Sequence, residues 1–454
     1  MKARITLVLT IVVVFSANLL AQATPNKGKN PIIIIPGIMG SKLVNSKTDE
    51  VVWVKLTEAK SDDLRLPIST NLLANRDDLI ATDIVDKVKL VKFLPGISVY
   101  SELIEFLEKK AGYRRGNWDI PLSDDDQDTY YVFAYDWRRD NVESARLLIQ
   151  KIEKLKAKLN KPDIKFDVIA HSMGGLITRY AAMYGNADLS EKPVPTWSGT
   201  KYFGKIFMLG TPNEGSMGAL ETLNEGYVID TLAGRIRPGY LNREVAFTIP
   251  SIYQLLPHGK SAKFYDENLK PLDLNIYDPA TWRKYGWAFT SDKDFQAQTS
   301  KTKRAEADKY FEVVLRRARL FHQALDVKTT VPKSLALYIY GSDCKNTLNG
   351  AVIRFDTEDA TWKTYTDGES FKNVRGEKIP EKSVRETIFG KGDGTVALSS
   401  LLAENISLLN GQNVFFDTPA SPNKMIVCEE HTSIPSNKKI QDIFTSVLSA
   451  SLAN

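Results

Sequence analysis

The chain is poor in the residues that build metal centres and disulfide frameworks. Its 454 residues include only two cysteines, Cys344 and Cys428, and four histidines. No group of cysteine, histidine and carboxylate residues has the spacing of a metal site, and no glycine-rich loop has the pattern that holds phosphate. We therefore predict neither a metal ion nor another cofactor. The two cysteines leave two alternatives open, a disulfide or two buried thiols.

Strong charge of one sign, internal repeats and low-complexity tracts are also missing. The formal net charge is +5, with 43% hydrophobic and 25% charged residues, which is typical of a globular protein with a large core. So small a charge excess gives no reason to expect nucleic acid as a partner. The length allows two or three domains, or one domain with large insertions, and the oligomeric state stays open.

The one long apolar run lies at the N-terminus. Lys2 and Arg4 precede a mostly apolar stretch over 5–20, and Ala21-Gln22-Ala23 has the small residues of a cleavage site. The run is shorter than the ~20 residues that a membrane span needs, although a retained anchor is the alternative. We predict a signal peptide over 1–23 and a secreted or periplasmic mature protein.

One stretch has the pattern of a strand, a sharp turn and a helix. Residues 166–170 are largely apolar, Ser172 follows between the small residues Ala170 and Gly174, and a helical run begins near Leu176. This order predicts a nucleophile elbow, in which the Ser172 hydroxyl projects above a sheet edge. The Met173 N–H, at a helix N-terminus, would then stabilise an oxyanion. A chance surface turn is the alternative.

The second candidate for oxyanion binding lies near the start of the mature chain. Ile32 to Ile35 predict a strand that is buried on both faces, as in a parallel sheet. The loop 36–40 follows, and in such sheets this loop supplies the second oxyanion donor, for which we favour the Ile38 N–H. An ordinary tight turn is the alternative interpretation.

Further strands and helices alternate along the chain. Strands are predicted over 129–135, 204–209 and 334–341, with helices between them, and this alternation predicts a right-handed parallel α/β sheet flanked by helices. Two stretches break the rhythm, so we predict an insertion over 41–98 and a cap domain over 213–329. The core would then comprise 24–40, 99–212 and 330–454. A basic helix over 301–325 is predicted to be a solvated face, with transient contact to anionic lipid head groups as the alternative.

A serine nucleophile needs a base and an orienting carboxylate, and four histidines allow a search by elimination. His171 lies beside the nucleophile in sequence and should point away from it, while His258 and His322 fall in the predicted cap. His431 follows the last core strand and is the predicted base. For the acid we favour Asp393, between two glycines, with Asp343 second.

These residues carry a resemblance to a known family. The matching pieces are 31–41, 135–138, 171–175, 209–212, 250–257 and 392–396 before His431, and they span most of the mature chain. On these pieces the sequence resembles the lecithin:cholesterol acyltransferase-like family of α/β-hydrolases, which includes lysosomal phospholipase A2. The resemblance implies Ser172, Asp393 and His431 as a catalytic triad, with oxyanion donors at Ile38 and Met173. It also implies a lipid-ester substrate and a lid or membrane-contact region within the insertion 41–98.

Three functions are compatible with these observations. The favoured one is a serine lipid acylhydrolase or acyltransferase, of the phospholipase A or lecithin:cholesterol acyltransferase type, that works through an acyl-enzyme. The second is a small-ester or thioester carboxylesterase with the same triad. The third is a non-catalytic binding protein with the same fold, which the intact serine, aspartate and histidine disfavour.

Overall fold

The computed structural model describes most of the chain after the predicted leader. The described residues are 29–54, 63–85, 100–121, 128–227, 229–231, 234–236, 241–403, 408–409 and 422–448. The predicted signal peptide lies outside them, as do parts of the predicted insertion 41–98. Within these ranges, no helix is both long enough and apolar enough to cross a membrane.

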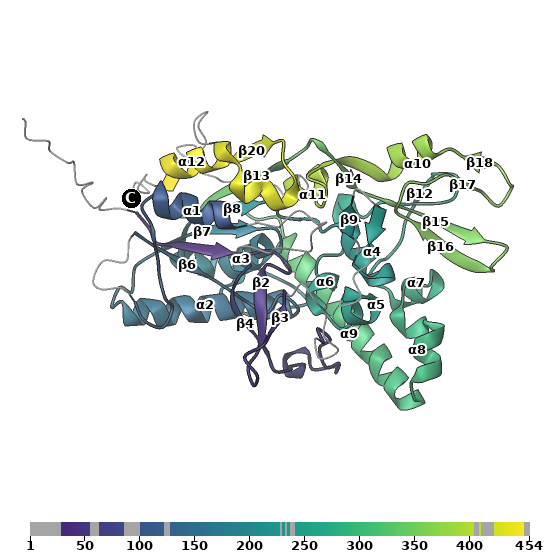
Figure 1. Ribbon diagram of the computed structural model, residues 1–454, viewed down its shortest axis with the longest axis horizontal. Helices are drawn as coiled ribbons and strands as arrows, with labels where there is room; N and C mark the ends of the chain where they lie inside the picture. Colours follow the sequence, from purple (N-terminus) through teal and green to yellow (C-terminus); the bar gives the residue numbers. More distant parts are fainter. Residues whose placement is uncertain are drawn as a thin grey trace, which may run out of the picture.

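A seven-stranded sheet forms the centre of the described chain (Figure 1). Its strand order is β20-β13-β8-β7-β1-β6-β5, and every neighbouring pair is parallel. Because parallel strands end at one edge, the loops that follow them gather there. The strands are β1 (Ile32–Ile35), β5 (Arg114–Arg115), β6 (Thr129–Val132), β7 (Phe166–His171), β8 (Phe203–Leu209), β13 (Ala336–Ser342) and β20 (Lys424–Val427).

The isoleucines of β1 show how the sheet is buried on both faces. Ile33 and Ile35 join the large core cluster beneath α2 and α3, whereas Ile32 and Ile34 join a second cluster beneath α1 and α12. Figure 1 shows these two helix pairs on opposite sides of the sheet. The predicted parallel sheet flanked by helices is therefore confirmed. The helices are α1 (Ser101–Lys109), α2 (Asn141–Lys158), α3 (Met173–Tyr184) and α12 (Lys438–Leu448).

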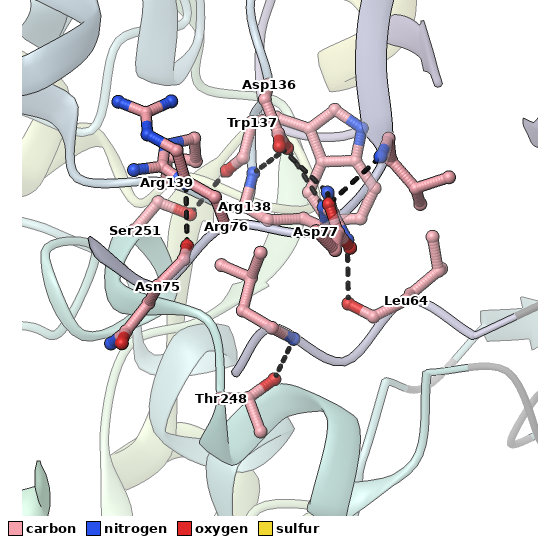
Figure 2. Close-up of polar contacts among 12 residues, drawn as sticks. Leu64, Asn75, Arg76, Asp77, Asp136, Trp137, Arg138, Arg139, Thr248 and Ser251 are labelled. Carbon is pink, nitrogen blue, oxygen red and sulfur yellow. Dashed lines mark hydrogen bonds and ion pairs between the residues drawn. The ribbon is translucent and has the colours of Figure 1, made fainter. Parts of the chain in front are cut away.

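The predicted insertion 41–98 contains a small antiparallel sheet with the order β3-β2-β4. Figure 2 shows how the segment between β3 and β4 is fixed to the core. The fully buried Arg138 guanidinium donates to Asp77 at 2.6 and 2.8 Å and to Asp136 at 2.8 and 2.9 Å. Arg138 thus links this segment to the loop after β6. The elements are β2 (Ser41–Asn45), β3 (Val51–Trp53), η1 (Leu72–Ala74) and β4 (Leu79–Ile84).

The predicted cap 213–329 is mainly helical, and α9 is its longest helix. Three arginines of the predicted basic face form ion pairs within the protein: Arg317 with Asp140 and Asp188, and Arg316 and Arg319 with Glu191. Contact with lipid head groups stays a prediction for the other cations of this helix. The elements are η3 (Ser198–Lys201), which precedes the cap, and α4 (Met217–Glu225), β9 (Ile229–Thr231), β10 (Gly234–Ile236), α5 (Arg243–Phe247), α6 (Pro250–Tyr253), η5 (Gly259–Ser261), β11 (Phe264–Tyr265), β12 (Pro271–Leu272), α7 (Pro279–Lys284), η6 (Phe289–Ser291), α8 (Lys293–Gln298) and α9 (Lys301–Leu325).

Residues 345–392 differ from the expected domain division. We assigned them to the core, yet β14–β19 contribute no strand to the central sheet, and β15 pairs instead with β11 of the predicted cap. Strand-like sequence identifies a strand without identifying the sheet that it joins. The elements of 345–392 and of the segments that follow it are β14 (Lys345–Leu348), β15 (Ala351–Asp356), β16 (Thr361–Tyr365), β17 (Phe371–Lys372), β18 (Lys378–Ile379), α10 (Glu381–Ile388), β19 (Phe389–Gly392), α11 (Leu398–Leu402) and η9 (His431–Ser436).

The two cysteines are joined. Cys344 and Cys428 form a disulfide that links the segment after β13 to the residue after β20. Of the two alternatives left open by the sequence, the structure therefore contains the disulfide. It fixes the chain three positions before His431.

Candidate active site

Ser172 lies on a strained turn between β7 and α3. Its φ and ψ are 53° and −126°, which is the unfavourable backbone that a nucleophile elbow requires. Gly174 permits the turn, because a Cβ there would lie 2.6 Å from the carbonyl oxygens of Ile35 and Pro36. A Cβ on Gly175 would likewise lie 2.0 Å from the Thr211 hydroxyl. The small residues are therefore required by close backbone approach to neighbouring strand ends.

Three side chains that are far apart in sequence meet at this turn. His431 Nε2 lies 2.9 Å from Ser172 Oγ, and His431 Nδ1 lies 2.7 Å from Asp393 Oδ2. His431 begins the helix η9, and its backbone N–H donates to the Asp393 carbonyl at 2.9 Å. The structure thus brings together the predicted nucleophile, base and acid in hydrogen-bond contact.

The Asp393 carboxylate is held ionised. Burial raises its pKa, but the nearby His431 and the backbone N–H groups of Val396 and Thr395 outweigh burial and keep the pKa below its usual range. Those N–H groups donate to Oδ1 at 2.7 and 2.9 Å, so Oδ2 is left for His431. A carboxylate at Nδ1 places the imidazole proton there, and Nε2 can then accept the Ser172 proton.

The other titratable candidates lie elsewhere. Asp343, the second candidate for the acid, has a 36% exposed side chain that pairs with Lys391 at 3.6 Å. His258 and His322 stack on each other in the cap, with ring centroids 3.9 Å apart. Neither ring contacts Ser172 in the part of the chain that the structure describes. The structure therefore brings His431 and Asp393, and none of these alternatives, to the Ser172 hydroxyl, and the roles of the three residues stay a prediction.

The two predicted oxyanion donors lie near the serine. Gly37, which precedes Ile38, approaches so closely that a Cβ would lie 2.8 Å from Ser172 Cβ. Met173 is the first residue of α3, where N–H groups have no partner within the helix. Neither the Ile38 nor the Met173 N–H donates a hydrogen bond to any described residue. Both remain available to a substrate oxygen.

Two buried tyrosines hold the loop that carries Ile38. The Tyr135 hydroxyl donates to the Pro36 carbonyl at 2.9 Å, and the Gly37 N–H donates to the Tyr100 hydroxyl at 2.9 Å. These contacts fix both sides of one peptide unit, directly before Ile38. Sequence reasoning missed both roles, because nothing in a single sequence relates a tyrosine to a loop more than sixty positions away.

A cavity of about 670 Å³ opens beside Ser172. One part of its wall is apolar and includes Trp137, Leu241, Ile252 and Leu255, together with Ile38 and Met39 of the oxyanion loop. Another part is polar. Its residues are Ser216, Glu221, Asn346, Thr366, Asp367 and Arg385. The cavity therefore offers an apolar surface for a hydrocarbon chain and polar groups for the remainder of a substrate.

Comparison with known proteins agrees with the resemblance seen in the sequence. Residues 49–404 match the family model described as lecithin:cholesterol acyltransferase. Phospholipase A(1) LCAT3 of Arabidopsis thaliana is 27% identical over 215 residues, which cover 42% of this chain and 43% of that protein. Lecithin-cholesterol acyltransferase-like 4 of Arabidopsis thaliana is 27% identical over 192 residues, which cover 37% of this chain and 33% of that protein. The aligned part thus spans less than half the length of either relative.

A solved structure shows the fold. A chain of the Tle4–Tli4 complex has a TM-score of 0.52 and 14% sequence identity, and the match covers 92% of this chain and 97% of that one. At this identity the similarity concerns the fold alone. Together with the parallel central sheet, it confirms the predicted α/β-hydrolase fold.

Proposed function

Because the chain belongs to the lecithin:cholesterol acyltransferase family, we propose that it is a secreted or periplasmic serine lipid acylhydrolase or O-acyltransferase. The observation that carries the proposal is the continuous hydrogen-bond series from Ser172 through His431 to Asp393, next to a cavity with an apolar wall. In this proposal Ser172 is the nucleophile, His431 the base and Asp393 the orienting acid.

The reaction follows from the roles of these groups. Ser172 Oγ attacks the ester carbonyl as His431 Nε2 takes its proton, and the N–H groups of Ile38 and Met173 stabilise the resulting oxyanion. The carbon–oxygen bond to the alcohol then breaks, and His431 returns the proton to the leaving alkoxide. Water or an acceptor alcohol attacks the acyl-enzyme in the same way, which releases the acid or a new ester.

The substrate class rests on the cavity and on family membership. A cavity of about 670 Å³ with both apolar and polar walls has room for an acyl chain and part of a glycerolipid. The names of the two plant relatives, a phospholipase A(1) and a lecithin-cholesterol acyltransferase-like protein, support a lipid ester. A small-ester or thioester carboxylesterase is the alternative.

The proposed compartment rests on one further observation. The Cys344–Cys428 disulfide is stable in an oxidising environment, such as the periplasm or the extracellular space. This supports export of the protein and the predicted cleavage after residue 23. Analysis of the N-terminus of protein recovered from the culture medium or periplasm tests this part of the proposal.

The decisive experiment is active-site labelling with a fluorophosphonate probe. We expect the wild-type protein to be labelled and Ser172→Ala to remain unlabelled, whereas Ser190→Ala, at an exposed serine, should be labelled like the wild type. Equal labelling of Ser172→Ala would refute the proposed nucleophile. No labelling and no ester turnover by the wild type would favour a binding protein.

The acyl-chain preference separates the two candidate substrates. We expect turnover of p-nitrophenyl esters to rise from two- and four-carbon to longer acyl groups, because apolar side chains form a large part of the cavity lining. A maximum at two to four carbons would favour the carboxylesterase. Product analysis on mixed phospholipids, with and without added sterol, would then show whether water or an alcohol accepts the acyl group.

A further inference from the structure

His171 lies next to the nucleophile in sequence, and the proposed reaction does not use it. Its ring is 5% exposed, and both ring nitrogens have partners. Nδ1 lies 2.9 Å from the Tyr100 hydroxyl, and Nε2 lies 3.0 Å from the backbone carbonyl of His431. A buried histidine with two defined partners between two parts of a catalytic site requires an explanation.

The partners determine where each proton lies. A carbonyl oxygen can only accept, so His171 Nε2 carries the proton and Nδ1 is an acceptor in the neutral ring. Tyr100 therefore donates its hydroxyl proton to Nδ1. The same hydroxyl oxygen accepts from the Gly37 N–H at 2.9 Å. The hydrogen bonds thus run in one direction, from Gly37 through Tyr100 and His171 to His431.

From this geometry we propose that Tyr100 and His171 form a positioning relay. The relay holds the oxyanion loop and the catalytic base at fixed positions relative to each other, on either side of Ser172. The relay joins the peptide before Ile38 to the backbone of His431. It touches no substrate, so both side chains are positioning residues. This inference rests on the proposed function of Ser172, His431 and Ile38.

The surroundings of His171 keep the relay in one protonation state. Burial, and then the neighbouring His431, lower the pKa of His171 to about 3. The ring therefore stays neutral at any pH at which a histidine base can work, and Nδ1 remains an acceptor for Tyr100. The rings of His171 and His431 also contact each other, with centroids 4.8 Å apart, so a displacement of one moves the other.

Three substitutions each remove a different set of the hydrogen bonds that form the relay. Tyr100→Phe removes the hydroxyl and keeps the ring volume. His171→Gln can place its amide nitrogen where Nε2 lies, which keeps the bond to the His431 carbonyl and loses the acceptor for Tyr100. His171→Asn can place its amide oxygen where Nδ1 lies, which keeps the acceptor and loses the bond to His431.

The expected kinetics follow from this separation. Each single variant should lower kcat about 10-fold with KM changed less than about 2-fold, because a lost hydrogen bond displaces catalytic groups and not the cavity wall. Tyr100→Phe breaks both hydrogen bonds of the Tyr100 hydroxyl, and His171→Gln breaks one of the same two, so the double variant should be no slower than Tyr100→Phe alone. Tyr100→Phe with His171→Asn breaks all three hydrogen bonds of the relay and should lower kcat about 100-fold, because the bond to the His431 carbonyl is lost as well.

The control variant is Tyr130→Phe, which removes a tyrosine hydroxyl that donates to Glu108 at 2.7 Å, away from Ser172. It should leave kcat unchanged. Each variant is measured as ester turnover and as the rate of fluorophosphonate labelling, below the melting temperature of the least stable protein.

The outcomes distinguish the relay from the proposed function. An inactive Ser172→Ala together with wild-type kcat in Tyr100→Phe would overturn the relay alone. Equal, additive losses in both double variants would also overturn it, since they would mean that the two residues act independently. Activity retained in Ser172→Ala would instead refute the proposed function.

Discussion

Replacement of Asp393 by asparagine tests the electrostatics of the proposed triad with almost no change in shape. Oδ1 of Asp393 already accepts the N–H groups of Thr395 and Val396 at 2.9 and 2.7 Å, so the amide oxygen of Asp393→Asn must remain on that side. The amide NH2 then faces His431 Nδ1, which lies 2.7 Å away in the wild type. Two donors cannot face each other, and His431 must shift its proton to Nε2.

The expected loss follows from that shift. With the proton on Nε2, His431 cannot accept the Ser172 proton across their 2.9 Å contact. The comparable change in a well-studied serine protease lowers kcat about 10⁴-fold, equivalent to about 5.5 kcal/mol of transition-state stabilisation. We expect a loss of that order here, with KM little changed, because Asp393 is not among the residues that line the cavity.

The assay is steady-state hydrolysis of a medium-chain p-nitrophenyl ester, with a thermal melt to show that the variant is folded. Asp343→Asn is the matched control, since Asp343 was the second candidate and its carboxylate faces Lys391 near the surface. We expect this control to retain the wild-type kcat. A folded Asp393→Asn with more than a tenth of wild-type kcat would refute the tautomer argument, and an inactive Asp343→Asn would reassign the acid.

Three further predictions concern stability. Lys205→Met should lower the free energy of unfolding by about 3–5 kcal/mol in urea titrations, because the Asp167 carboxylate, 3.1 Å from the Lys205 amine, stays buried without its cation. Adding Asp167→Asn to this variant should restore most of the lost stability. The pKa of His171 falls from 6.5 to about 3 on folding, so its contribution to the free energy of unfolding is complete above pH 6.5 and is lost as the pH falls toward 3. Between pH 7 and 5 the free energy of unfolding should therefore fall by about 2 kcal/mol more in the wild type than in His171→Gln, and equal decreases would contradict this. Replacing Cys344 and Cys428 by serine opens a loop with a sequence separation of 84 and should lower the free energy of unfolding by about 4.5 kcal/mol relative to the oxidised wild type, whereas reduced wild-type protein should match the double variant.

The parts of the fold that the sequence predicted are those with strong local signals. The helix α9 covers Lys301–Leu325, as expected, because its apolar residues recur at helical spacing and Ser300 caps its start by accepting the Lys303 N–H. The strands β1 and β7 are runs of buried apolar residues. By contrast, the pairing of β15 with β11 depends on two segments about 85 residues apart, and no local pattern encodes it.

The same limit applies to the site. His431 could be found because the chain has so few histidines, and Asp393 because Gly392 and Gly394 mark an unusual turn. Tyr100 could not be found, because as one of 18 tyrosines it looks like any apolar position at the start of a helix. Its function depends on Gly37 and His171, which only the folded sheet brings within 2.9 Å of its hydroxyl.

The residues that line the cavity come from two parts of the fold, and we expect one part to determine the chemistry and the other the substrate selectivity. Ser172, Ile38 and Trp137 come from loops of the central sheet, whereas much of the remaining wall comes from 216–255 and 346–389, outside that sheet. The hydrogen bonds that join Ser172 to His431 and Asp393, and Gly37 to His431, include no side chain from these two stretches. One side chain of the second stretch, Thr347, accepts the Gly394 N–H beside Asp393. Substitutions of wall residues in the insertions, such as Leu348, should therefore change chain-length preference and KM and leave the rate of fluorophosphonate labelling within about 2-fold of the wild type. A labelling rate that falls with KM would mean that the insertions also position the nucleophile.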